Sequence, residues 1–153
     1  KMSKGSKIRI DDATIDIYLS TKAMLDISEL MDKPFEELNE WLIPEGGISP
    51  DIQLSRICDV IGILANAAIY RHNSQVRMNL ISGDIKEFYN IADFRNVLDP
   101  FKMDYYFKAI TECLKKDNAV VIPDGYVSAE EDEVLKEIEE AKNHSAGDAV
   151  TAS

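Results

Sequence analysis

The chain has 153 residues, of which 45% are hydrophobic and 29% charged, and its formal net charge is -11. This length and composition predict one globular domain with a single core. The strong negative charge repels phosphate backbones, so DNA and RNA are not expected partners. No apolar run approaches the roughly 20 residues of a membrane span, and residues 1–7 are not followed by the apolar stretch of a signal peptide. We therefore expect a soluble protein of the cytoplasm.

A short β-hairpin is predicted at the N-terminus. Apolar and polar residues alternate over residues 8–10 and again over residues 15–19, with the polar residues Asp11-Asp12-Ala13 between the two runs. Alternation with a period of two around polar turn residues is typical of two antiparallel strands joined by a tight turn.

Two helices are expected to follow the hairpin. Ser20 and Thr21 can cap a helix whose apolar residues recur at intervals of three and four, and this helix should end near Lys33. Pro34 suits the first turn of a second, short helix over residues 35–42, because its missing amide has no partner at that position.

The strongest helical pattern begins at Pro50, directly after a second capping residue, Ser49. Its apolar stripe at helical spacing consists of Leu54, Ile57, Ile61, Leu64, Ala65 and Ala68. We expect this segment to be the central core helix, and to continue through residues 71–75 towards Leu80 rather than stop and restart there. Gly62 destabilises a helix by about 1 kcal/mol relative to Ala. We expect close packing of a neighbouring segment at Gly62 to compensate for this cost.

Shorter elements are expected in the second half of the chain. Residues 82–84 have the composition of a turn and helix cap, which predicts a short helix carrying Ile85, Phe88 and Tyr89. Residues 93–98 are expected to add a helical turn. A further apolar stripe from Tyr105 to Leu114 predicts another helix, whereas residues 119–122 fit either a short strand or an extended linker. These elements complete the pattern of a chain that is mostly helical.

The sequence therefore predicts a mainly α (α+β) fold, a compact helical domain with a short N-terminal β-hairpin and an acidic C-terminal helix. The helical domain with its hairpin is expected to span residues 1–123. Ser128, followed three residues later by a glutamate, begins a capping box within an acidic amphipathic helix at residues 124–142. Small and polar residues then predict a disordered tail at residues 143–153.

The residue types that carry chemistry do not gather into a motif. His72 and His144 lie in polar stretches and make a poor set for a metal or a general base. Cys58 and Cys113 lie within apolar helical patterns, which favours buried side chains over a disulfide. No phosphate-binding glycine loop or calcium loop has the required spacing, so we predict no cofactor, no metal and no enzymatic activity. An enzymatic function remains an alternative only because four carboxylates have no assigned role: Asp84, Glu87, Asp93 and Asp99.

The order of elements resembles a known family. A strand-turn-strand segment, IRIDDATIDIYL at residues 8–19, runs directly into STKAMLDISEL at residues 20–30. PFEEL at residues 34–38 and the alanine-rich ILANAAI at residues 63–69 follow. Over about residues 8–117 this pattern resembles the tail assembly chaperones of long-tailed bacteriophages and prophages.

The resemblance implies a helical protein that holds the tape measure protein soluble until tail tube subunits assemble around it. It implies no catalytic residues, and a longer form made by translational frameshifting, which would begin near the acidic helix. A chaperone for an apolar helical client can offer a groove built from flexible Met and aromatic side chains. We expect this groove to be formed by exposed members of one set of residues: Met24, Phe35, Met103, Tyr105 and Tyr106.

A second interpretation needs no phage role. The chain would then be a cytoplasmic helical adaptor or regulatory domain that dimerises through the stripe from Leu54 to Ala68. Both interpretations leave room for a homo-oligomer, and both predict a protein as the binding partner.

Overall fold

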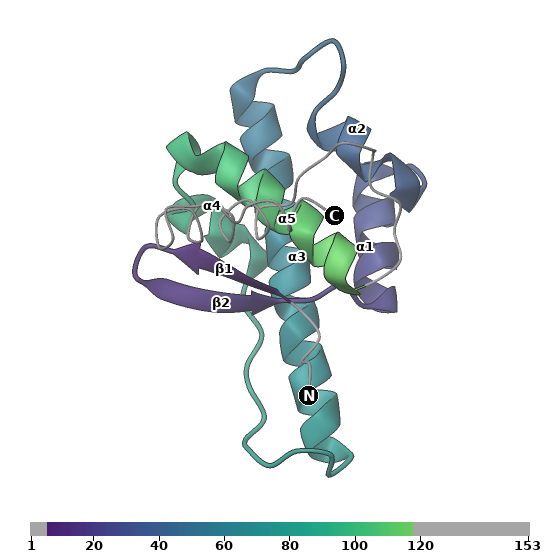
Figure 1. Ribbon diagram of the computed structural model, residues 1–153, viewed down its shortest axis with the longest axis vertical. Helices are drawn as coiled ribbons and strands as arrows, with labels where there is room; N and C mark the ends of the chain where they lie inside the picture. Colours follow the sequence, from purple (N-terminus) through teal and green to yellow (C-terminus); the bar gives the residue numbers. More distant parts are fainter. Residues whose placement is uncertain (1–5, 118–153) are drawn as a thin grey trace, which may run out of the picture.

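The computed structural model describes residues 6–117, which form a two-stranded sheet, five α-helices and three short 3-10 helices (Figure 1). The elements in chain order are β1 (Ser6–Ile10), β2 (Ala13–Ile17), α1 (Thr21–Met31), η1 (Phe35–Glu37), α2 (Leu38–Leu42), α3 (Pro50–Arg77), η2 (Ile91–Asp93), α4 (Phe94–Val97), η3 (Pro100–Lys102) and α5 (Met103–Asp117). The predicted mainly α fold with an N-terminal hairpin is confirmed. The predictions for residues 119–122, the acidic helix 124–142 and the tail 143–153 lie outside the described residues.

Helix α3 is the central element of the fold. It contacts β2, α1, α2, η2, α4 and α5. Figure 1 shows α3 running through the middle of the described chain, with its C-terminal end projecting beyond the hairpin. The side chains of Ile57, Ile61 and Leu64 are at most 1% exposed. The predicted core helix is therefore confirmed, and it continues through residues 71–75 to end at Arg77.

The hairpin packs one face of its two strands against the helices. β1 and β2 pair antiparallel, and Asp11 in the two-residue turn has a φ of 56°, which aspartate adopts more readily than most residues. Ile8 and Ile17 are fully buried. At the end of β2 the N–H of Tyr18 donates to the carbonyl of Leu64, at 3.0 Å, which ties the hairpin to α3.

The boundaries of the two helical segments that follow the hairpin are set by a capping side chain, a left-handed residue and a proline. The hydroxyl of Ser20 accepts a hydrogen bond from the N–H of Ala23 at 3.0 Å, which confirms the predicted cap of α1. α1 ends at a left-handed residue, Asp32, close to the predicted end. Pro34 is extended and precedes the second helical segment, which starts as η1 and continues as α2.

The segment after α3 differs from the prediction. Residues 83–90, which we call the strap, form no helix and instead run back alongside α3 to η2 (Figure 1). The predicted short helix carrying Ile85, Phe88 and Tyr89 is therefore wrong. Gly83, with a φ of 133°, starts the strap in a conformation that other residues rarely adopt, and polar side chains of α3 then hold its backbone extended, as described below. The helical turn predicted over residues 93–98 is present as η2 and α4.

Gly62 permits the close approach of α3 to η2. A Cβ atom at Gly62 would lie 2.7 Å from Cγ2 of Ile91 and 3.2 Å from a ring carbon of Phe94. Real Cβ atoms do not come this close to neighbours, so any larger residue must push η2 and α4 away. The expected compensation for a glycine in the core helix is thus confirmed.

By length and hydropathy alone, α3 is the one described helix that could cross a membrane. The core helix of a soluble protein passes the same test, and 44% of the apolar window in α3 is buried inside the fold. The packing of every neighbouring element against α3 accounts for its apolar composition. The expectation of no membrane contact stays a prediction.

We expect Gly62→Ala to destabilise the fold by about 1–3 kcal/mol, because the cost of overpacking exceeds the gain in helix propensity. Urea unfolding followed by circular dichroism measures the change. Gly46→Ala is the matched control, since a Cβ atom at Gly46 would have no neighbouring atom within 4 Å and the φ of Gly46 is not positive. A Gly62→Ala variant as stable as the Gly46→Ala variant would contradict the close packing of α3 and η2.

Candidate binding groove

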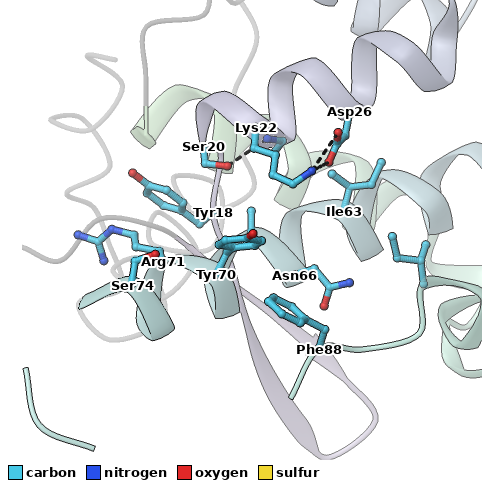
Figure 2. A pocket seen from close by; sticks show the side chains of 13 residues that line it. Tyr18, Ser20, Lys22, Asp26, Ile63, Asn66, Tyr70, Arg71, Ser74 and Phe88 are labelled. Carbon is cyan, nitrogen blue, oxygen red and sulfur yellow. Dashed lines mark hydrogen bonds and ion pairs between the residues drawn. The ribbon is translucent and has the colours of Figure 1, made fainter. Parts of the chain in front are cut away.

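A groove of about 490 Å³ lies where the β2–α1 junction, α3 and the strap meet (Figure 2). This volume falls in the range of sites that bind ligands or single anchoring segments. Its apolar wall is formed by Ala23 of α1, Ile63, Ala67 and Tyr70 of α3, Phe88 of the strap and Ile91 of η2. The groove thus combines side chains from four elements: α1, α3, the strap and η2.

An aromatic pair stands at the open side of the groove. The rings of Tyr70 and Phe88 have their centroids 5.2 Å apart at an angle of 44°. Tyr70 is 47% exposed and Phe88 is 48% exposed, so each ring keeps about half of its surface in water. Covering the remaining half of one such ring contributes on the order of 1 kcal/mol to binding. The pair is therefore a ready anchor for an apolar partner.

The polar groups at the rim are largely engaged within the protein. Nζ of Lys22 lies 3.1 Å from Oδ2 of Asp26, one turn away on α1 (Figure 2). The Ser20 hydroxyl is used by the helix cap. The guanidinium of Arg71 lies over the ring of Tyr18, 5.0 Å from its centroid, a cation–π contact. These polar side chains therefore already have partners within the protein.

Two asparagines of α3 hold the strap that forms the outer wall of the groove. Asn73 accepts from the N–H of Lys86 at 2.8 Å and donates to the carbonyl of the same residue at 2.9 Å. Asn66 accepts from the N–H of Tyr89 at 2.8 Å and donates to its carbonyl at 3.0 Å. Each amide side chain thus binds both backbone groups of one strap residue, as a neighbouring strand would.

The spacing of the two asparagines matches the strap. Asn66 and Asn73 are two helical turns apart, which corresponds to about 10.5 Å along the helix axis. Lys86 and Tyr89 are three residues apart, which corresponds to about 10 Å of extended chain. Because the two repeats agree, both asparagines bind without bending the strap. These four hydrogen bonds compete with helix formation and explain why the predicted helix is absent.

The histidine and the two cysteines among the described residues have surroundings typical of structural side chains. Nε2 of His72 lies 2.9 Å from the carbonyl oxygen of Asp84, so this histidine adds a further contact to the strap. Burial raises the pKa of the Cys58 thiol to about 11, and the nearby carboxylate of Asp59 contributes to the rise, so the thiol stays protonated at neutral pH. Cys113 is also buried. Within residues 6–117 no group of three or more His, Cys, Asp or Glu side chains could hold a metal ion.

The four unassigned carboxylates do not line the groove. Asp84, Glu87 and Asp93 are exposed. Asp99 caps η3, because its Oδ1 accepts a hydrogen bond from the N–H of Phe101 at 2.9 Å. The arrangement gives Asp99 a structural role.

Two of the five predicted partner-binding residues are in the core. Phe35 is 9% exposed and Tyr106 is 2% exposed, so neither can dock a partner on the surface, and this part of the prediction is wrong. The Tyr106 hydroxyl accepts from the N–H of Asp99 at 2.9 Å, and burial raises the pKa of that hydroxyl. Aromatic residues at helical spacing fill the interior here because they bury more apolar surface than any other side chain.

The other three predicted residues lie partly buried against the core and away from the groove. Met24, Met103 and Tyr105 pack on the buried cluster, and the Tyr105 hydroxyl accepts from the N–H of Arg9 at 3.0 Å. None of the five lines the groove. The groove aromatics Tyr70 and Phe88 were missed, because Tyr70 lies off the main stripe of its helix and Phe88 was assigned to a helix that does not form.

We expect Asn73→Ala to release the strap, because the backbone groups of Lys86 would lose both of their partners. Hydrogen exchange of the strap amides, read by mass spectrometry, should rise by about tenfold or more, as expected for the loss of about 1.4 kcal/mol or more of local stability. Asn96→Ala, at an exposed position of α4, is the control. Equal exchange in the two variants would show that Asn73 does not hold the strap.

Comparison with known proteins gave no match. No family model matches the chain, and neither a curated protein nor a solved structure matches it. The function is therefore argued from the residues and the geometry of this chain.

Proposed function

We propose that this chain is a non-enzymatic chaperone whose groove binds an apolar helical segment of a client protein. The groove with its half-exposed Tyr70–Phe88 pair is the observation that carries this proposal. More specifically, we propose a tail assembly chaperone of a long-tailed bacteriophage or prophage, with the tape measure protein as client. This assignment is supported by the order of the hairpin and helices in the sequence, and it locates the chain in the cytoplasm of a bacterial host.

Exposed apolar side chains also occur where the chain leaves the end of α3 and enters the strap. Met78, Leu80 and Ile81 follow α3, Ile85 lies in the strap, and each of the four is at least 40% exposed. A monomer rarely leaves so many large apolar side chains together in water unless a partner covers them. This surface supports a binding role for the same end of the molecule.

The apolar lining of the groove favours a helical client over an extended one. The side-chain amides of Asn66 and Asn73 are already used, because they bind the backbone N–H and carbonyl groups of Tyr89 and Lys86. An extended client would need backbone partners of its own, whereas a helix satisfies its backbone internally. A helix also presents apolar side chains at intervals of three and four, which suits an apolar groove. The negative net charge of the chain would keep such a complex dispersed.

The adaptor interpretation loses its predicted interface. Dimerisation through the stripe from Leu54 to Ala68 requires that stripe to be accessible, but Ile57, Ile61 and Leu64 lie inside the core. A second copy could reach them only if the hairpin and the neighbouring helices moved away. A homo-oligomer through a different surface stays a prediction.

Co-expression tests the proposal directly. The chain is expressed with the large helical protein encoded beside its gene, and the soluble fraction of that protein is measured. We expect wild type to keep it soluble, and Tyr70→Asp or Phe88→Asp to reduce the soluble fraction several-fold, because a charge in an apolar contact is costly to desolvate.

Phe101→Asp is the matched control. Phe101 is 94% exposed and does not line the groove, so this variant adds the same charge in place of an aromatic ring elsewhere on the surface. Circular dichroism must show that all three variants are folded. The proposal is wrong if the groove variants hold the client as well as Phe101→Asp does, or if the neighbouring protein is equally soluble without this chain.

A further inference from the structure

A second hollow of about 400 Å³ lies between the hairpin, α3 and the strap. Tyr18 and Arg71 line both this hollow and the apolar groove. Its lining contains apolar side chains such as Ile15 and Ile69, but also more polar groups than the apolar groove, and we call it the polar hollow. The polar side chains that matter here are Ser6, Lys7, Arg71, His72, Gln75 and Lys86.

Ser6 places a buried hydroxyl without a partner at this hollow. Ser6 is 9% exposed, and its Oγ has no hydrogen-bond partner in the part of the chain that the structure describes. Ser6 occupies an inward position of β1, on the same face as the buried Ile8 and Ile10, so it faces the helices rather than the solvent. A buried hydroxyl costs free energy unless it forms a hydrogen bond, and a ligand in the hollow would supply one.

Positive charge exceeds negative charge around the hollow. Lys7 is paired with Asp16. Arg71 and Lys86 have no ion pair with any carboxylate among residues 6–117, and Glu87 is the remaining carboxylate that lines the hollow. Three cationic side chains thus face two anionic ones, in a chain whose net charge is -11. Such a local excess attracts an anion.

Arg71 and Lys86 are held in ways that suit anion binding. The ring of Tyr18 supports the guanidinium of Arg71 at 5.0 Å, which restricts a side chain that would otherwise be mobile. The N–H and the carbonyl of Lys86 are both bound by the side chain of Asn73. A planar guanidinium can donate two parallel hydrogen bonds to a phosphate or carboxylate, and an ammonium adds a point charge.

We propose that the polar hollow binds an oxyanion, with Arg71 and Lys86 supplying charge and Ser6 donating a hydrogen bond. The oxyanion is a phosphate or a carboxylate group, which have this recognition chemistry in common. The site adjoins the client groove, with which it shares Tyr18 and Arg71, but the proposal does not depend on the proposed function. Glu87 opposes binding and limits the affinity of the site.

The test is an NMR titration of the full chain with inorganic phosphate and, in a second arm, with acetate, each at constant ionic strength. We expect saturable shifts of the backbone amides of Ser6, Arg71 and Lys86. Saturation by phosphate alone indicates that free phosphate or a phosphorylated small molecule is the ligand, whereas saturation by acetate indicates a carboxylate group. If neither anion gives saturable shifts at these residues, the proposal is overturned.

Variants separate a built site from general attraction to a basic surface. Arg71→Gln and Lys86→Gln should each weaken binding about tenfold, the effect of losing one charge-assisted hydrogen bond. Glu87→Gln should strengthen it, whereas Lys102→Gln, outside the hollow, should not change it. Ser6→Ala should weaken binding several-fold without loss of stability, since the hydroxyl has no partner among residues 6–117.

Two results would overturn the assignment even if anions bind. One is a Ser6→Ala variant that binds as wild type does, and the other is an equal loss in Lys102→Gln and Arg71→Gln. Tyr70→Asp and Phe88→Asp should leave the phosphate titration unchanged, because neither side chain lines the polar hollow. A failure of the client proposal is therefore distinguishable from a failure of this one.

Discussion

The buried face of α3 is the contact on which the other described elements depend. The hairpin has only two strands of five residues, and an isolated two-stranded hairpin is at best marginally stable in water. α1 has 11 residues, fewer than an isolated helix needs to persist. Both acquire their stability by covering α3, through Ile17 of the hairpin and Ile27 of α1 among others. The hairpin and the helices should therefore unfold together rather than as separate units.

The second half of α3 supports its neighbours in a different way. Besides burying apolar residues such as Leu64 and Ile69, the helix here uses Asn66 and Asn73 to bind the backbone of the strap. This leaves the strap side chains free, so Phe88 can stand beside Tyr70 at the groove while Lys86 faces the polar hollow. Both candidate sites consequently exist only while the asparagines hold the strap. Asn66 and Asn73 are thus a structural condition for both of the proposed binding sites.

Sequence patterns predicted those elements whose signals are local. The alternation of the hairpin, the Ser20 cap and the periodic stripe of α3 depend on neighbours within a few residues, and all three are confirmed. The strap could not be predicted in this way, because its conformation depends on Asn66 and Asn73, which are 23 and 13 residues away from their partners. The groove was missed for the same reason. Its walls come from four segments, and a Met or aromatic residue such as Tyr106 at helical spacing gives no sign of whether it faces the core or the solvent.

The shared wall of Tyr18 and Arg71 links the apolar groove to the polar hollow physically. The backbone of Tyr18 is fixed to α3, since its N–H donates to the carbonyl of Leu64. The ring of Tyr18 supports the guanidinium of Arg71. A ligand that draws Arg71 towards the polar hollow changes the edge of the groove, and a client that displaces Tyr18 removes the support of Arg71. Any resulting change in affinity must be equal in both directions, because coupling between two binding sites is reciprocal. The cation–π contact is therefore the place where an anion could influence client binding without touching the client.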